Sequence, residues 1–300
     1  MLGKVVFGGV MTIFELVKLT LDELYQDAVT EHGTEVDQVI TECLGYLSDS
    51  YKDLTSDERE PVNYGDPAVR FAYVFRYVAA HGDYIVQLLK AFRAEMGGAI
   101  FSEPTVRVTC IGGGPGSDVI AVLKYLSDMG KHEKAQKLIC YLLDGEQGWA
   151  DAWTEFDEKI QTDVKVSPVF QKLDVSDSGS WKSQKKFLQS DIFTMSYFVS
   201  EVMSQDAEGD VSDFWMKLFE GAKPGALFFY IDNGAKPFNE YIDGLAGAAG
   251  LETVFSIDNK RFTPSYSEQA SELAEYRKKF DGLNPKIQAY LSCRVFRKPS

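Results

Sequence analysis

Apolar residues recur with helical spacing through the first hundred positions of the chain. They follow the i, i+3, i+4, i+7 rule of an amphipathic helix in two successive stretches. These positions are Ile13, Val17, Leu21, Leu24 and Ala28, then Val36, Val39, Ile40, Cys43, Leu44 and Leu47. After a polar linker at 55–67, two more helices are expected, divided by Gly82 and with Asp83 capping the second. The pattern predicts a helical N-terminal region over 1–103.

The pattern changes at Val106 to short apolar runs that alternate with amphipathic ones. The strands expected from these runs span 106–112, 137–144, 165–174, 191–198 and 225–232. Most are apolar throughout, which is typical of parallel strands covered on both faces by helices. After Asp232 the pattern indicates a helix, a strand, an insertion at 259–287 and a last strand. We therefore expect a second region, 104–300, of the α/β class.

A glycine-rich turn, "CIGGGPGSD", follows the first expected strand and opens a helix. Gly112, Gly114 and Gly116 allow a tight turn, a close approach of a ligand to the backbone, and close helix packing. Ser117 is the expected helix cap. Taken alone, the turn leaves a nucleotide-type ligand and a purely structural role equally open.

Acidic residues at the ends of the next two strands favour a ligand. Asp144 follows the second strand and Asp174 the third, so both belong to the sheet edge that carries the turn. A carboxylate at the first position suits the hydroxyls of a ribose, and one at the second suits the amine of an adenine covered by Val175. No Gly-Lys-Ser/Thr follows the turn, and Asp118 stands where a phosphate-binding lysine would be wanted. A ligand poor in phosphate is therefore favoured.

These motifs together resemble those of the class I S-adenosylmethionine (SAM)-dependent methyltransferases. The residues that carry the resemblance are "VTCIGGGPGSD", "YLLDGEQGW", "KLDVSD", "QSDIFTMSYF" and "KPGALFFYIDN", within 104–298. The resemblance implies a doubly wound, seven-stranded, mostly parallel sheet with an antiparallel pair at one edge. It also implies SAM as cofactor, with S-adenosylhomocysteine as product. An NAD site is the competing interpretation, but the G-x-G-x-x-G spacing would place its last glycine at Ser117.

The resemblance also implies roles for single residues in binding the cofactor. By position, the three glycines would approach the methionine and ribose, Asp144 the ribose hydroxyls, and Asp174 with Val175 the adenine. Asp191, at the fourth strand, would lie near the methionine moiety.

The sequence says less about which residues would bind the methyl acceptor. Relatives that methylate exocyclic amines carry an N/D-P-P-Y run after the fourth strand, whereas this chain has "MSYF" at 195–198. Tyr197 is a candidate wall of the acceptor pocket, and Glu201 a candidate polar contact or base. In the N-terminal helices, three residues would either pack on the sheet domain or form a lid over the acceptor. These three are Tyr73, Tyr77 and His81.

Composition narrows the class of partner. The net charge of -14 over 300 residues argues against a protein that binds nucleic acid by broad phosphate neutralisation, so a small molecule is favoured as acceptor. An RNA or protein acceptor stays open, and so does a catalytically silent, SAM-binding regulatory module.

The cysteines, the histidines and the hydropathy bear on metal binding and localisation. Four cysteines without CxxC pairs and three scattered histidines predict no metal site and suggest free thiols of a cytoplasmic protein. The sequence shows no apolar run of membrane-spanning length, and no A-x-A-like cleavage site follows its apolar start, so neither a membrane helix nor a signal peptide is expected.

Overall fold

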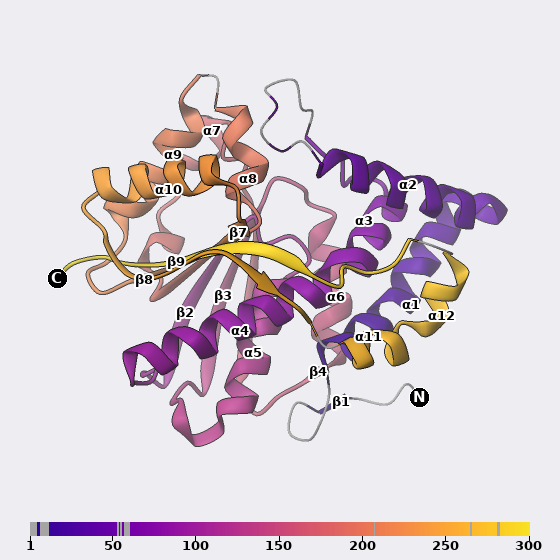
Figure 1. Cartoon of the computed structure of the whole chain (residues 1–300), viewed down its shortest axis with the longest axis horizontal. Helices are drawn as coiled ribbons and strands as arrows, with labels where there is room; N and C mark the ends of the chain where they lie inside the picture. The colour runs from indigo at the N-terminus through magenta and orange to yellow at the C-terminus, as the bar shows by residue number, and fades with distance from the viewer. Residues whose placement is uncertain are drawn as a thin grey trace.

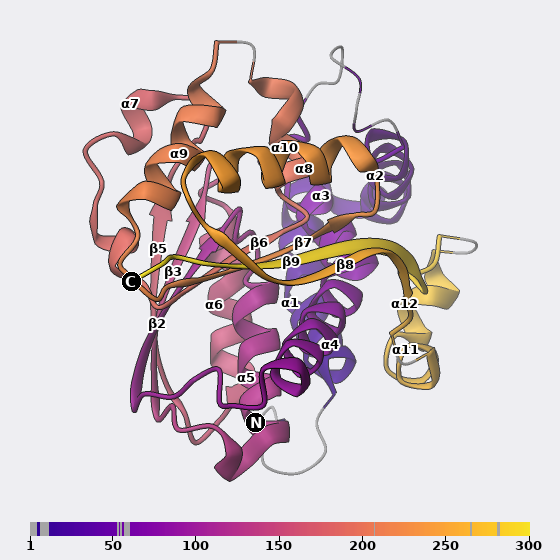
Figure 2. The ribbon, with the colours of Figure 1, turned by 60° about the vertical axis from the view of Figure 1, so that its left-hand side comes forward.

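The computed structural model describes residues 5–6, 12–52, 54, 56, 61–206, 208–264, 266–280 and 283–300. Most of the first eleven residues, where no signal peptide is expected, and part of the polar linker lie outside these residues. A twisted sheet forms the centre, with helices on both faces (Figures 1 and 2). α4, α5 and α6 cover one face, and α7 to α10 cover the other.

The central sheet has seven strands in the order β5-β3-β2-β6-β7-β9-β8. All pairs are parallel except those of β9, which runs antiparallel to both neighbours. The strands are β2 (Thr105–Ile111), β3 (Lys137–Asp144), β5 (Lys165–Lys172), β6 (Ile192–Ser196), β7 (Leu227–Asn233), β8 (Glu252–Phe262) and β9 (Ala289–Arg297). This is the predicted fold of the class I methyltransferases. The strand expected before the insertion extends to Phe262, so the predicted insertion at 259–287 begins within β8.

Helices precede the first strand of this sheet and also connect its strands. They are α1 (Ile13–His32), α2 (Val36–Ser50), α3 (Pro67–Tyr73), η2 (Val74–Val78), α4 (Ala79–Met96), α5 (Ser117–Met129), α6 (Trp149–Lys159), α7 (Ser178–Trp181), α8 (Val199–Val202), α9 (Asp210–Gly221), α10 (Lys236–Ala248), α11 (Tyr266–Glu272) and α12 (Ala274–Lys279). Short 3-10 turns span Gly33–Glu35, Gly130–His132, Lys186–Gln189 and Met203–Gln205. β1 (Val5–Val6) and β4 (Ile160–Gln161) form a separate parallel pair.

The N-terminal helices share one hydrophobic core with the sheet and with α5 and α6. The predicted stripe of α1 is buried throughout, from Ile13 to Ala28, because it faces this core. Asp66 caps α3 by accepting a hydrogen bond from the Ala68 amide at 2.7 Å. The helix then continues through a π-helical turn, η2, into α4.

The prediction that Gly82 ends this helix was wrong. Gly82 lies inside α4, and Asp83 accepts a hydrogen bond from the Gln87 side chain rather than capping a new helix. A Cβ on Gly82 would lie 3.2 Å from Cδ1 of Ile13, so the missing side chain lets α1 approach closely. Gly82 therefore serves helix packing.

A buried carboxyl lies in the first turn of α5, directly after the glycine turn. Asp118 is 3% exposed and accepts a hydrogen bond from the Ser196 hydroxyl on β6. Burial raises the pKa of this carboxyl to about 6, only partly offset by that hydrogen bond. At neutral pH this carboxyl is therefore charged, although its buried surroundings favour the neutral form.

We predict opposite effects for leucine at two helical glycines. Gly82→Leu should lower the free energy of unfolding by about 1–3 kcal/mol through overpacking against Ile13. Gly45→Leu should leave it unchanged or raise it, because a Cβ there meets no atom within 4 Å and leucine favours a helix. Urea denaturation of both variants measures the difference, and equal losses would contradict the packing role of Gly82.

Asp118→Asn should stabilise the fold at high pH and have little effect at low pH. The pKa is raised in the folded state, so the aspartate destabilises the fold when charged, above about pH 6, and this cost fades as falling pH protonates it. The expected gain at pH 8 is on the order of 2 kcal/mol. Thermal unfolding between pH 4 and pH 8 measures it, because the cost is complete above the folded pKa of about 6 and is lost only near the ordinary pKa of 3.8. A pH-independent gain would refute the origin in charge.

Candidate functional site

The glycine turn combines two packed positions with one that faces open space. Gly112 and Gly116 have φ of +62° and +90°, and a Cβ on them would lie 2.0 Å from the Phe198 ring and 2.2 Å from the Trp153 ring. A Cβ on Gly114 would meet nothing closer than 4.0 Å. The helix cap is Gly116, and the predicted cap Ser117 is instead the first residue of α5. The left-handed backbone at Gly116 explains this difference, since it favours glycine.

Asp144 holds this turn in place. Its Oδ2 accepts a hydrogen bond from the Gly114 amide at 2.9 Å, and its Oδ1 accepts one from the Glu146 amide at 3.0 Å. Burial raises the pKa of Asp144 to about 6 despite these two bonds. Each carboxylate oxygen keeps a second lone pair, so the group can still accept hydrogen bonds from a ligand.

A cleft runs along the carboxyl ends of β2, β3 and β5. One part, of about 240 Å³, is lined by Asp144, Asp174 and Val175 among others. A smaller part, of about 70 Å³, borders Gly112 and Gly114. Both parts share the four residues Tyr64, Asp144, Phe198 and Glu201. The fold thus brings Gly112, Gly114 and both acids to one cleft, whereas Gly116 packs against Trp153.

Asp191 does not join the other predicted residues. It precedes β6 at the amino end of that strand, where it accepts a hydrogen bond from the Arg107 amide at 2.7 Å and pairs with Lys223. It borders a separate cavity of about 540 Å³ that also contacts Phe92 and Leu227. The placement near the methionine moiety was wrong because the amino and carboxyl ends of a strand lie at opposite edges of the sheet. We leave Asp191 out of the candidate site.

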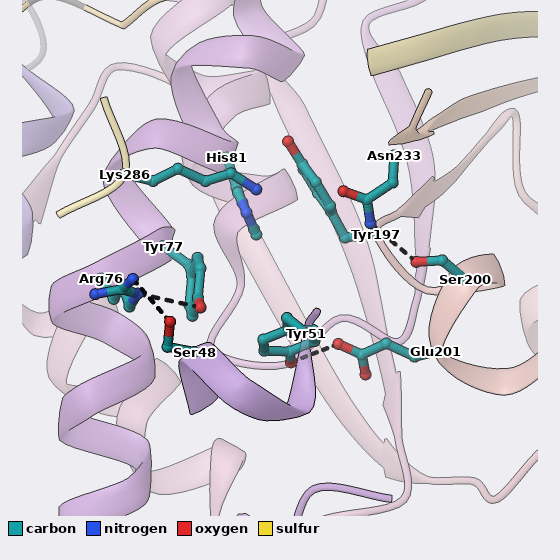
Figure 3. A pocket seen from close by; sticks show the side chains of 10 residues that line it. All are labelled: Ser48, Tyr51, Arg76, Tyr77, His81, Tyr197, Ser200, Glu201, Asn233 and Lys286. Carbon is teal, nitrogen blue, oxygen red and sulfur yellow. Dashed lines mark hydrogen bonds between the residues drawn. The ribbon is translucent and has the colours of Figure 1, made fainter. Parts of the chain in front are cut away.

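A second pocket, of about 210 Å³, adjoins this cleft and is the candidate acceptor pocket (Figure 3). It brings together segments far apart in the chain. Its residues are Ser48, Tyr51, Arg76, Tyr77, His81, Tyr197, Ser200, Glu201, Asn233 and Lys286. The predicted residues Tyr77, His81, Tyr197 and Glu201 thus meet here. Tyr73 lies instead at the smaller part of the cleft, against Trp149.

Tyr197 and His81 form a stacked wall of the acceptor pocket. Their ring centroids lie 3.7 Å apart with the planes inclined by 10°. Tyr197 has φ of +56°, uncommon for a residue with a side chain, and its amide donates to the Ile231 carbonyl at 2.8 Å. Neither its hydroxyl nor Nε2 of His81 has a hydrogen-bond partner in the described part of the chain. Both atoms are buried within the wall.

Burial controls the charge of this wall. It lowers the pKa of His81 well below its ordinary value, and the positive charge of Lys286 lowers it further. Burial also raises the pKa of Tyr197 well above its ordinary value. Both rings are therefore neutral at neutral pH.

Glu201 stands where the cleft and the acceptor pocket meet. It lines both parts of the cleft and the pocket itself. Its Oε1 accepts a hydrogen bond from the Tyr51 hydroxyl at 2.6 Å, and that hydroxyl is also bonded to Tyr64. The carboxylate is therefore held in one place at the junction.

Several residues of the site were missed by sequence reasoning. Tyr51 and Tyr64 lie in or beside helices that the sequence identifies by their apolar side alone. Asp232 ends β7 and accepts hydrogen bonds from the amides of Ser200 and Asn233 at 2.9 and 2.7 Å. An acid after a buried strand was the available signal for Asp232. Lys286 lies in an irregular segment of the insertion and has no such signal.

The described residues also bear on metal binding and on membrane insertion. No three His, Cys, Asp or Glu side chains gather there in a way that could hold a metal ion. None of the helices found there combines the length and the apolar character needed to cross a membrane.

Comparison with known proteins bears on the identity of the chain. Solved structures with similar folds include the YcgJ protein of Bacillus subtilis, with TM-score 0.41 and 15% identity, covering 72% of this chain and 99% of that one. An O-methyltransferase family protein of Burkholderia thailandensis has TM-score 0.42 and 13% identity, covering 90% and 74%. A methyltransferase of Pyrococcus furiosus has TM-score 0.43 and 9% identity, covering 72% and 83%. No curated protein sequence matches the chain.

A family model is more decisive than these structures. The model described as "Putative SAM-dependent methyltransferase" matches residues 64–233, which is more than half of the chain and includes the glycine turn, both acids and β2 to β7. The chain therefore belongs to this family of SAM-dependent methyltransferases, enzymes whose cofactor is S-adenosylmethionine.

Proposed function

We propose that SAM lies along the cleft, with its methionine and ribose at Gly112 to Gly116. Asp144 would accept the ribose hydroxyls, and Asp174 with Val175 would hold the adenine. Three observations support this fit: Gly114 has no side chain to fill the cleft, Asp144 has lone pairs to spare, and Asp174 lines the same space. When bound, the cofactor supplies an activated methyl group, so the protein has to align the acceptor and exclude water.

We propose that the methyl acceptor occupies the pocket beside Tyr77, His81 and Tyr197. The observation that carries this proposal is that Tyr197 and Glu201 line both this pocket and the glycine part of the cleft. A nucleophile held in the pocket would therefore face the methyl group. An accessible pocket on this side favours methyl transfer over a silent binding module.

We propose a small molecule as the acceptor. A pocket of about 210 Å³ walled by aromatic rings suits a single planar ring, and the net charge of -14 opposes broad contact with a polyanion. The alternative acceptors are a base of an RNA and a side chain of a protein, and labelling of a cell extract distinguishes them.

We propose that region 1–103 acts as a cap on region 104–300. Tyr51, Arg76, Tyr77 and His81 come from the first region and line the acceptor pocket, and this supports the division. We also propose a cytoplasmic location, supported by the free thiols of all four cysteines.

The cofactor site is tested by calorimetry. Wild type should bind SAM in preference to NAD and ATP. Asp144→Ala should weaken binding by about 1.5–3 kcal/mol, the range for hydrogen bonds to charged groups. Asp191→Asn, which changes a carboxylate at the opposite edge of the sheet, is the control and should bind SAM as wild type does. Unchanged affinity in Asp144→Ala would remove this residue from the site.

The acceptor site is tested with SAM that carries a radioactive methyl group. Wild type should label the small-molecule fraction of a cell extract rather than its RNA or protein. Glu201→Gln, which still accepts from Tyr51, should slow labelling at saturating SAM about ten- to a hundredfold by loss of a charged contact. The control is Glu220→Gln, on the exposed end of α9. Label confined to RNA or protein would overturn the small-molecule proposal.

A further inference from the structure

Lys286 places an ammonium group in the acceptor pocket. Its backbone is fixed on both sides, because its amide donates to the Arg76 carbonyl at 2.8 Å and its carbonyl accepts from the Gln269 side chain at 2.9 Å. The Arg76 carbonyl belongs to η2, a π-helical turn of the kind often found at functional sites. The side chain extends along the pocket above His81 (Figure 3). Its Nζ lies 4.8 Å from the Tyr197 ring centroid and 5.7 Å from that of Tyr77.

This ammonium has no direct anionic partner. Among the described residues, none accepts a hydrogen bond from it or forms an ion pair with it. The charged and titratable groups around it are Asp232 on β7, Glu201 on α8, Arg76 and Tyr77 on η2, His81 on α4, and Tyr197 after β6. The oxygens of Asp232 accept hydrogen bonds from the amides of Ser200 and Asn233, and Glu201 accepts one from Tyr51. Within the described residues, the ammonium lies against the faces of Tyr77 and Tyr197, and Asp232 attracts it without a direct contact.

A cation enclosed in this way favours a negatively charged ligand. Burial lowers the pKa of Lys286 to about 8, against the opposing effect of Asp232, so the group is still mostly protonated at neutral pH. Removing a charge from water without a partner costs free energy, and an anion placed beside it recovers part of that cost. Arg76, which lines the same pocket, adds a second positive charge.

Transfer of a proton from a neutral acceptor to His81 would be unfavourable in this pocket. Protonating this ring would create a second buried cation beside Lys286, and both burial and that charge oppose it. An acceptor group that is already an anion needs no such transfer of a proton to His81.

We propose that the methyl acceptor is a planar compound with a weakly acidic O–H or N–H group, and that Lys286 selects its deprotonated form. This inference rests on the proposed function of the pocket. The electron pair of the acceptor anion forms the new bond to the methyl carbon, while the pair of the breaking carbon–sulfur bond stays on sulfur. One negative and one positive charge disappear together. Lys286 therefore binds the reactant anion more strongly than the neutral methylated product, which favours product release.

The test uses 4-nitrophenol as the probe, because its anion and its neutral form absorb at different wavelengths. The protein is first saturated with S-adenosylhomocysteine, and binding of that molecule is verified by calorimetry. The probe is then titrated one pH unit below its own pKa. Wild type should bind the anion at least about tenfold more tightly than the neutral form, which lowers the apparent pKa of the probe by about one unit or more.

Substitutions at Lys286 separate charge from shape. Lys286→Met keeps an unbranched side chain and both backbone hydrogen bonds, and it should abolish the spectral shift. Lys286→Arg should retain the shift. The matched control is Lys260→Met, an exposed lysine of β8 outside the pocket, which should behave as wild type.

The outcomes distinguish this inference from the function on which it rests. Failure to bind S-adenosylhomocysteine would count against the proposed cofactor site itself. Three other outcomes would overturn the role of Lys286 alone, provided that S-adenosylhomocysteine binds. They are that the probe does not bind, that it binds in its neutral form, or that Lys286→Met leaves the spectral shift unchanged.

Discussion

The hydrogen bond from the Gly114 amide to Asp144 is the constraint on which the candidate site depends. It joins the turn after β2 to the end of β3, and so fixes the loop where two parallel strands finish. Its cost is visible in the carboxyl, whose pKa burial raises to about 6. A group held at that cost is rigid and only partly satisfied, which is the condition a binding site needs. A second bond, from the Gly113 amide to the Leu143 carbonyl at 3.0 Å, joins the same turn to β3.

The acceptor pocket depends on a different principle, in which segments far apart in sequence meet over one aromatic wall. The His81 ring from α4 stacks on Tyr197 from the β6–α8 connection, and Lys286 from the segment before β9 lies over both. Tyr197 adopts its left-handed backbone because the stack and its bond to Ile231 hold it there. Strained backbone at such a place is commonly maintained by surrounding structure for function. The pocket therefore exists only when the N-terminal helices are packed on the sheet.

Features that depend on the local pattern of the chain could be predicted from the sequence, whereas features that depend on contacts between distant residues could not. The apolar runs, the glycine turn, Asp144 and Asp174 were recognisable because period and order along the chain determine them. Gly82 was misjudged because its role is a contact with Ile13, nearly seventy positions away in sequence. Asp191 was misplaced by the ambiguity of which strand end it occupied. Lys286 was missed because no local pattern records that its amide meets the Arg76 carbonyl.

Net charge and pocket charge lead to different conclusions about the acceptor. The total of -14 acts on large partners at a distance, and salt screens it within about 8–10 Å. Inside the pocket, Lys286 and Arg76 act at contact distance, surrounded by rings and by carboxylates already bonded to other groups. A small anion can therefore enter a site that the outer surface would deny to a large one. In the proposal made here, the local arrangement of two cations, rather than the acidic composition, selects the acceptor.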